Sequence, residues 1–363
     1  MTIPPKITGL RARAVDVPMR RPLQTSSLLI RTAPLALLDV ETDGGIVGRS
    51  YLFCYAGAML KPVVAMLEAV APMIAGDAAA PFDVGQKLAR RFALPSPQGV
   101  VAMALAGVDM ALWDAAAQAA GAPLARLLGG TPRRIPAYNS NGLGLIGAER
   151  VPQEALELAA GGFRAVKLRL GYPTLAEDLA AVEAARAALP DGIALMTDYN
   201  QCLAPVEAEI RGRALDDAGL AWIEEPTRWD DDAGNARIAA ALATPVMAGE
   251  SFWGPHDMAR ALAARACDYV MPDAMKIGGV SGWLRAAAIA GEHAMPMSSH
   301  LYPEISAHLL AVTPTAHWLE YVDWAAPILA EPIAIEDGHA VIPERPGAGI
   351  AWNEAAVARC RVT

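Results

Sequence analysis

The sequence predicts an α/β fold: a modified (β/α)8 TIM-type barrel with an α+β capping domain formed by the N-terminal region and the C-terminal tail. Strand-like apolar runs alternate with helix-length segments from Arg134 to Glu320, and they number eight, as in such a barrel. Asp198, Glu224 and Glu250 follow three successive predicted strands at spacings of 26 residues. Because parallel strands end at one face of the barrel, these acids are expected to converge there.

The first predicted domain spans residues 1–132. Residues 6–53 alternate apolar and polar side chains, which indicates antiparallel strands, and Asp43-Gly44-Gly45 fits a hairpin turn between two of them. The periodicity then predicts helices over residues 58–75, 83–93 and 98–120. The pattern changes to alternating strands and helices after Thr131 and Pro132, which sets the domain boundary.

The second predicted domain, residues 133–322, is the catalytic barrel. Its eight strands are expected at residues 135–140, 163–170, 193–200, 220–226, 245–250, 269–275, 295–300 and 317–322. The last crossover is expected to be short or absent. Residues 323–363 form a tail with strands near 333–337 and 339–344, and we expect it to pack back on the capping domain.

Composition narrows the class of protein. The 363 residues are 54% hydrophobic and 19% charged, with a net charge of −9, so a large core is expected and nucleic acid is not an expected partner. We found neither a signal-peptide core nor an uninterrupted 18-residue apolar run, and therefore predict a cytoplasmic protein without a membrane partner. The four cysteines form no CxxC and are interpreted as buried thiols in a reducing compartment.

Every predicted barrel strand ends in a polar or ionisable side chain. In chain order these are Ser140, Lys167 with Arg169, Asp198 with Asn200, Glu224, Glu250, Asp273 with Lys276, His300, and Glu320. Active sites of such barrels lie at this face, so the set predicts an enzyme. Three converging carboxylates with oxygen-only ligands favour Mg²⁺, with Mn²⁺ as a substitute ion.

The residue types suggest a reaction on a carboxylate substrate. Lys167 and Arg169 lie two apart on one strand and share a face, and His300 comes from the opposite side. Asp273 is placed to hydrogen-bond His300 and raise its basicity. The metal would stabilise the enediolate that forms when the α-proton is removed. Glu225 should point away from Glu224, which favours a salt bridge outside the site.

Several long stretches, among them DYNQ, WIEEPT, MPDAMKIGGVSGW, MSSHL and TPTAHWLE, resemble the mandelate racemase/muconate lactonizing branch of the enolase superfamily over nearly the whole chain. The resemblance implies that Asp198, Glu224 and Glu250 bind Mg²⁺ and that His300 and Asp273 form the base dyad for an R-configured carbon. It implies that Glu320 and Lys167 contact the substrate carboxylate, and it suggests a homo-oligomer, with an octamer as one option. The residues expected to bind substrate are Ser140, Asn200, Lys276, Tyr55 and Leu301.

One departure from the family pattern divides the functional hypotheses. The second barrel strand carries Lys167-Leu168-Arg169 where the family has Lys-x-Lys, and arginine is a poor base near neutral pH. We expect a racemase or epimerase of 2-hydroxy acids, because the capping segment 23–30 is mostly apolar. The alternative is an acid-sugar dehydratase that uses His300 as its single acid and base; Arg21 and Arg31 keep that hypothesis open.

A third hypothesis rests on a glycine motif. Gly142-Leu143-Gly144-Leu145-Ile146-Gly147 matches the GxGxxG fingerprint of NAD(P)-dependent oxidoreductases and follows a predicted strand. The next strand, however, ends in Lys167 and Arg169 where a ribose-binding acid is expected. A glycine-rich first loop of the barrel explains the motif better, so this remains a remote alternative.

Overall fold

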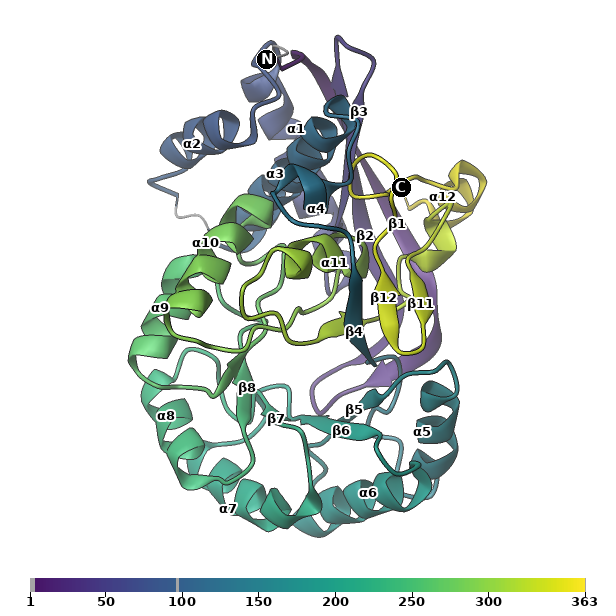
Figure 1. Ribbon diagram of the computed structural model, residues 1–363, viewed down its shortest axis with the longest axis vertical. Coiled ribbons are helices and arrows are strands. Elements are labelled where there is room, and N and C mark those ends of the chain that lie inside the picture. Colours follow the sequence, from purple (N-terminus) through teal and green to yellow (C-terminus); the bar gives the residue numbers. More distant parts are fainter. Residues whose placement is uncertain (1–3, 96–97, 363) are drawn as a thin grey trace.

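The computed structural model describes residues 4–95 and 98–362. Figure 1 shows a ring of helices around the barrel strands, with a separate layer of strands and helices packed over one part of the ring. The predicted fold class is confirmed: an N-terminal capping domain accompanies a (β/α)8 barrel.

The capping domain is built on an antiparallel sheet of three strands in the order β1-β2-β3. Their bounds are β1 Ile7–Gln24, β2 Leu29–Thr42 and β3 Val47–Phe53. The helices that follow are α1 Gly57–Ile74, α2 Pro81–Arg91, α3 Gly99–Ala119 and α4 Leu124–Leu127. The three predicted long helices and the turn between the second and third strands are thus confirmed.

The sheet and α3 lie in close contact because glycine occupies the point of approach. A Cβ built on Gly48 of β3 would lie 2.0 Å from the carbonyl oxygen of Ala111 in α3, so no larger residue fits there. α3 is mostly buried, and Met110 and Leu112 are fully inaccessible to solvent. This packing explains why its sequence is apolar almost all round.

Two helices, α1 and α3, are long and apolar enough to cross a membrane by length and composition alone. Buried core helices meet the same criteria, and α3 is mostly buried within the protein. α1 carries Lys61 and Glu68, and α3 carries Asp109 and Asp114. Length and composition are therefore weak evidence for a membrane span here.

The barrel strands run parallel from β4 to β9 in sequence order, and β10 pairs with β4. The strands are β4 Arg134–Asn139, β5 Ala165–Arg169, β6 Ala194–Asp198, β7 Ile223–Glu224, β8 Val246–Ala248, β9 Tyr269–Val270 and β10 Leu319–Tyr321. The helices between them are α5 Val151–Ala159, α6 Leu175–Ala188, α7 Pro205–Leu215, α8 Asp232–Ala241, α9 Pro255–Ala263, α10 Gly279–Glu292 and α11 Pro303–Ala311.

The predicted strand at 295–300 is the exception. The segment makes only isolated parallel bridges, from Met297 to Val270 and Ala316 and from His300 to Asp273. Ser298 N and His300 N donate to the carbonyl oxygens of Val270 and Pro272. Pro272 has no N–H to donate back, which interrupts the ladder between these two bonds. The bridges still fix the segment between its neighbours, so His300 reaches the same end of the barrel as the other strand-end residues.

The C-terminal tail contacts both parts of the molecule. β11 Ala334–Glu336 and β12 His339–Val341 form a hairpin, and β12 pairs antiparallel with β4 of the barrel. α12 Glu354–Cys360 lies against the capping sheet, where Val362 N donates to Ala14 O at 3.1 Å. The Trp352 indole also donates to the buried Asp39 carboxylate at 2.8 Å.

The cysteines form no disulfide among the described residues. Cys54 and Cys267 are buried, as expected, and Cys360 is half-buried. Cys202 is exposed, which contradicts the prediction that all four thiols are buried. Cys202 lies in a surface loop after the end of β6. Side chains of such connecting loops are commonly exposed, because the loop runs over the surface and is not packed in the core.

Candidate active site

A cavity of about 190 Å³ lies between the C-terminal ends of the barrel strands and the capping domain. The cap covers it with Leu23, Thr25, Ser27, Leu28, Ile30, Phe53 and Tyr55, and Trp324 adds a further apolar side chain. This volume is room for about six water molecules and falls below the range of about 300–1,000 Å³ typical of drug-sized ligands. The cavity therefore fits a small molecule rather than a dinucleotide.

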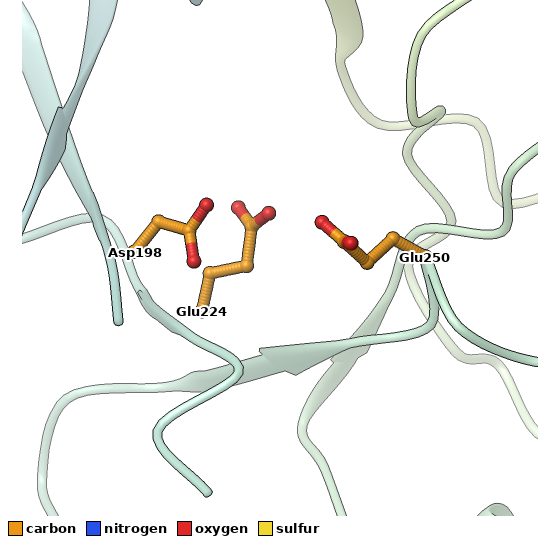
Figure 2. Close-up of side chains that lie close together, drawn as sticks. All are labelled: Asp198, Glu224 and Glu250. Carbon is orange, nitrogen blue, oxygen red and sulfur yellow. The ribbon is translucent and has the colours of Figure 1, made fainter. Parts of the chain in front are cut away.

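Three carboxylates meet at one side of this cavity, as their spacing predicts (Figure 2). Asp198 ends β6, Glu224 ends β7 and Glu250 follows β8, and one oxygen of each lies within 4.8 Å of the others. Burial and the neighbouring Asp198 charge raise the pKa of Glu224 to about 8. Three mutually repelling buried acids with only oxygen donors fit a hard divalent cation.

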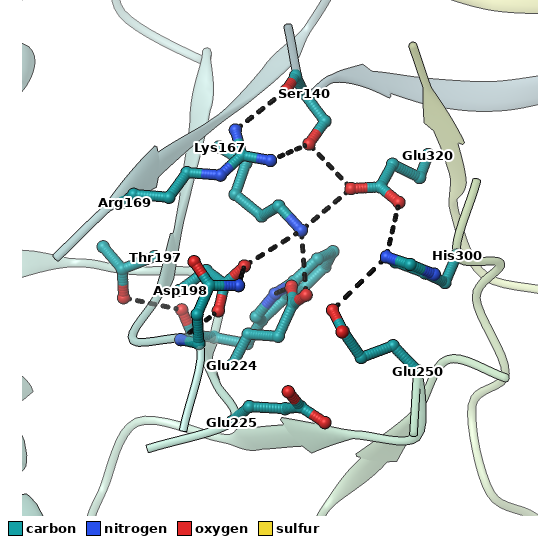
Figure 3. Close-up of polar contacts among 12 residues, drawn as sticks. Ser140, Lys167, Arg169, Thr197, Asp198, Glu224, Glu225, Glu250, His300 and Glu320 are labelled. Carbon is teal, nitrogen blue, oxygen red and sulfur yellow. Dashed lines mark hydrogen bonds and ion pairs between the residues drawn. The ribbon is translucent and has the colours of Figure 1, made fainter. Parts of the chain in front are cut away.

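Lys167 is buried, and its ammonium lies between two of these acids and Glu320 (Figure 3). Its Nζ is 2.8 Å from Glu224 Oε1, 2.8 Å from Glu320 Oε1 and 3.4 Å from Asp198 Oδ2. Burial alone would lower the pKa of this ammonium, but the three carboxylates outweigh it and hold the pKa above its ordinary value. Lys167 is therefore a fixed positive charge.

His300 faces the cavity from the opposite side, held by Asp273. Its Nδ1 lies 2.7 Å from Asp273 Oδ2, and its Nε2 lies 3.3 Å from Glu250 Oε2. Asp273 Oδ1 accepts from the backbone N–H groups of Met275 and Lys276, so the carboxylate is itself held in place. Burial opposes protonation of His300, but Glu250, Glu320 and Asp273 together raise its pKa to about 9.

Arg169 lines the cavity on the Lys167 side, and its guanidinium is held by hydrogen bonds. Nη1 donates to the carbonyl oxygens of Ser140 and Gly142, at 2.8 and 3.0 Å, and Nη2 donates to Ser140 Oγ at 2.8 Å. Ser140 Oγ in turn donates to Glu320 Oε1 at 2.7 Å. A buried guanidinium with three such bonds serves as a positioned cation and not as a proton acceptor.

The five residues expected to bind substrate occupy two different positions. Asn200, Tyr55 and Leu301 line the cavity. Ser140 lies between Arg169 and Glu320, and Lys276 lies under the Tyr55 ring, with Nζ 4.7 Å from its centroid. Asn200 also donates to both oxygens of Asp198, from N at 2.7 Å and from Nδ2 at 2.9 Å, which orients that carboxylate.

The prediction for Glu225 is wrong: it lines the cavity and forms no ion pair with any described residue. The strand ends at Glu224, and Glu225 has a φ of +37°, in the left-handed region. The alternation that places neighbours on opposite faces therefore stops one residue earlier than assumed. Gln201, the last residue of the DYNQ stretch, and Trp324 also line the cavity, and neither was among the predicted site residues.

The GxGxxG loop packs against the cap. Leu145 N donates to Gln24 O at 2.8 Å, and a Cβ built on Gly144 would lie 2.5 Å from that same oxygen. The glycines thus permit close approach of two backbones. The helix that follows begins at Val151, several residues after the motif, so its N-terminus does not adjoin the loop as a dinucleotide fingerprint requires.

The chain matches two family descriptions, one for each domain. Residues 7–129 match the mandelate racemase/muconate lactonizing enzyme N-terminal domain, and residues 150–356 match the enolase C-terminal domain-like family. L-talarate/galactarate dehydratase of Salmonella typhimurium is 31% identical over 97% of this chain and 90% of its own length.

Two solved structures are similar over nearly the whole chain. An enolase from alpha proteobacterium BAL199 with bound Mg is 46% identical, with a TM-score of 0.97 over 98% of this chain and 99% of that one. An enolase from Bradyrhizobium, complexed with magnesium and mandelic acid, is also 46% identical, with a TM-score of 0.96 over 100% of both chains. The protein is therefore an enzyme of the enolase superfamily and belongs to its mandelate racemase/muconate lactonizing enzyme family.

Proposed function

We propose that the protein binds Mg²⁺ through Asp198, Glu224 and Glu250 and removes the α-proton of a small 2-hydroxy carboxylate. The donor set supports this metal, because its oxygens converge within 4.8 Å and three carboxylates outnumber the single Lys167 ammonium that contacts them. When bound, Mg²⁺ would neutralise the charge that develops on the substrate carboxylate during proton removal. Magnesium in the two 46% identical structures supports the same assignment.

The remaining polar residues have separate roles in this proposal. Lys167 and Glu320, 2.8 Å apart, would contact the substrate carboxylate at the end of the cavity where Ser140 lies. His300 Nε2 faces the cavity and would accept the α-proton in its neutral form, and Asp273 would hold the ring through Nδ1. Mg²⁺ held by Glu250 would favour that form, because it would offset the carboxylate charge that most raises the pKa of His300. A small molecule fixed between them would present its α-carbon to one base.

The observation that favours a particular reaction is the hydrogen bonding of Arg169. Its guanidinium donates three bonds and Lys167 beside it is held protonated, so neither of these two basic residues is available as a proton acceptor. A single base suits dehydration of a 2,3-dihydroxy carboxylate. His300 takes the α-proton, the β-carbon–oxygen bond breaks, that proton leaves with the hydroxyl as water, and the enol product becomes a 2-keto acid. Similarity to a dehydratase supports this reaction.

Racemisation of an aryl or alkyl 2-hydroxy acid is the second candidate. The apolar cap residues Leu23, Leu28, Ile30 and Phe53 favour a substrate with an apolar side chain. The mandelic acid complex of the Bradyrhizobium relative points the same way. Reaction of both enantiomers needs a group on the Arg169 face that can accept the α-proton as well as return it, so it requires Arg169 or Lys167 to lose its proton.

Incubation of the Mg²⁺-loaded protein with enantiopure acids in deuterated water separates these reactions. Dehydration predicts 2-keto acid, measured as the semicarbazone absorbance, from 2,3-dihydroxy acids only. Racemisation predicts deuterium at the α-carbon and loss of optical activity from both enantiomers of a mandelate-like acid. If no acid yields either product, or if activity persists in excess EDTA, the proposed function is wrong.

A further inference from the structure

The wall of the cavity beyond the metal carboxylates contains polar atoms that the proposed reaction leaves unused. Glu225, Gln201, Tyr55 and Asn200 form this wall, which we call the distal wall, and Ser251 supports it through Gln201. Gln201 Nε2 donates to Glu225 Oε2 at 2.7 Å and to Ser251 Oγ at 3.1 Å. These bonds fix the Glu225 carboxylate in one orientation.

Three buried atoms around this wall have no hydrogen-bond partner among the described residues: Glu225 Oε1, Asn200 Oδ1 and the Tyr55 hydroxyl. All three residues line the same cavity, and Glu225 is only 1% exposed. A buried polar atom without a partner costs about 1–3 kcal/mol. Three in one place indicate that a bound molecule supplies the missing bonds.

The chemistry of these atoms selects the kind of group. The carbonyl of Asn200 only accepts hydrogen bonds, so the bound group must donate to it, whereas the Tyr55 hydroxyl can both donate and accept. A second carboxylate is disfavoured, because Asp198, Glu224 and Glu250 already concentrate negative charge nearby. An ammonium is disfavoured by Lys276, whose Nζ lies 3.5 Å from Ser251, which supports this wall. A neutral hydroxyl meets all of these conditions.

Position indicates where on the substrate this hydroxyl lies. Figure 3 shows Glu225 beyond Glu224 and Glu250, on the side of the site away from Ser140 and Glu320. If the substrate carboxylate lies at the Ser140 end, the chain beyond the α-carbon extends toward Glu225. We propose that Glu225 is a specificity-determining residue whose Oε1 forms a hydrogen bond with a substrate hydroxyl beyond the α-carbon.

This inference rests on the proposed function and makes it more specific: the substrate is a monocarboxylic acid with a hydroxyl beyond C2. Binding tests it without turnover. In a His300→Asn background loaded with Mg²⁺, the dissociation constants of 2-hydroxybutanoate, 2,3-dihydroxybutanoate and 2,3,4-trihydroxybutanoate are measured by calorimetry, using each stereoisomer. At least one hydroxylated acid should bind about 10–100-fold more tightly than 2-hydroxybutanoate, as expected when a buried polar group without a partner gains one.

Adding Glu225→Leu should reduce this preference about 10–100-fold, whereas Glu225→Gln, which keeps an acceptor oxygen and the side-chain shape, should retain more of it. The isosteric variant also guards against a misfolded leucine protein. Equal binding of all the acids, binding of none, or a preference unchanged in Glu225→Leu would overturn the inference. A loss of Mg²⁺ affinity alone would assign Glu225 to the metal's water shell and overturn it as well. Absence of turnover in the wild type would count against the proposed function only.

Discussion

Two buried histidines eight residues apart, His300 and His308, occupy opposite electrostatic environments. His300 is 6% exposed at the barrel mouth, where Glu250, Glu320 and Asp273 outweigh burial and raise its pKa to about 9. His308 is fully buried in α11, and burial lowers its pKa to about 4. Its Nδ1 accepts from Ala125 N at 3.1 Å, which joins α11 to α4.

The contrast shows that burial alone does not define a functional group. The barrel mouth brings together more acids than Lys167 can neutralise, so its groups are poised to exchange protons or bind a cation. Around His308 the neutral ring serves as a hydrogen-bond acceptor within the core. The two regions therefore respond differently to mutation, metal and pH.

The largest expected effect separates the two histidines by activity. His300→Asn should lower α-proton exchange by about 10³-fold or more, because it removes the only base on its face of the cavity. NMR of deuterium incorporation in deuterated water measures it. His308→Gln, the matched control, should keep exchange within about threefold of the wild type, since it lies outside the cavity. Similar losses of α-proton exchange in both variants would contradict the assignment of His300 as the base.

Mg²⁺ binding should stabilise the folded protein through the carboxylates of the barrel mouth alone. Mg²⁺ at 100 times its dissociation constant should raise the free energy of unfolding by about 2.7 kcal/mol, measured from denaturation curves. The double variant Asp198→Asn with Glu224→Gln should lose this stabilisation, because two of the three donors lose their charge. His308→Gln should keep it. An equal Mg²⁺ effect in the double variant would place the ion elsewhere.

Protonation of His308 should make the free energy of unfolding depend on pH. Its folded pKa of about 4 lies below the unfolded value of about 6.5, so the unfolded state binds the extra proton between these values. His308 therefore contributes full stability above pH 6.5, and this contribution is lost as the pH falls toward 4. It should amount to about 2 kcal/mol between pH 7 and pH 5.

Comparing denaturation of the wild type and His308→Gln at several pH values measures that contribution. The difference between their unfolding free energies should shrink by about 2 kcal/mol from pH 7 to pH 5, since glutamine does not titrate. A difference independent of pH would show that His308 does not carry this dependence.

The smallest effect concerns the opposite face of the cavity. Arg169→Lys should lower exchange from the preferred enantiomer about tenfold, because lysine cannot reproduce the three bonds to Ser140 and Gly142. It should also introduce slow deuterium exchange from the other enantiomer, measurable by chiral chromatography with mass detection. If that second exchange is already present in the wild type, Arg169 does not prevent two-base chemistry.

Local sequence was sufficient to predict most of the architecture. The three cap helices, the hairpin turn and the parallel strands follow from periodicity and turn residues, which depend on neighbouring side chains. The spacing of Asp198, Glu224 and Glu250 also predicted their convergence, because each position is tied to the end of a strand. The His300–Asp273 contact at 2.7 Å follows from adjacent strands in the same way.

Only the tertiary structure decided the features that depend on contacts distant in sequence. The left-handed backbone at Glu225 turns its side chain into the cavity, and alternation within a strand does not predict this. The bonds of Arg169 depend on the loop after β4, and the strand expected at 295–300 is reduced to isolated bridges because Pro272 on the neighbouring segment cannot donate. Sequence thus determined which chemical groups reach the barrel mouth, because strand ends are encoded locally. Folding decided which groups stay free to react, because their hydrogen bonds come from other parts of the chain.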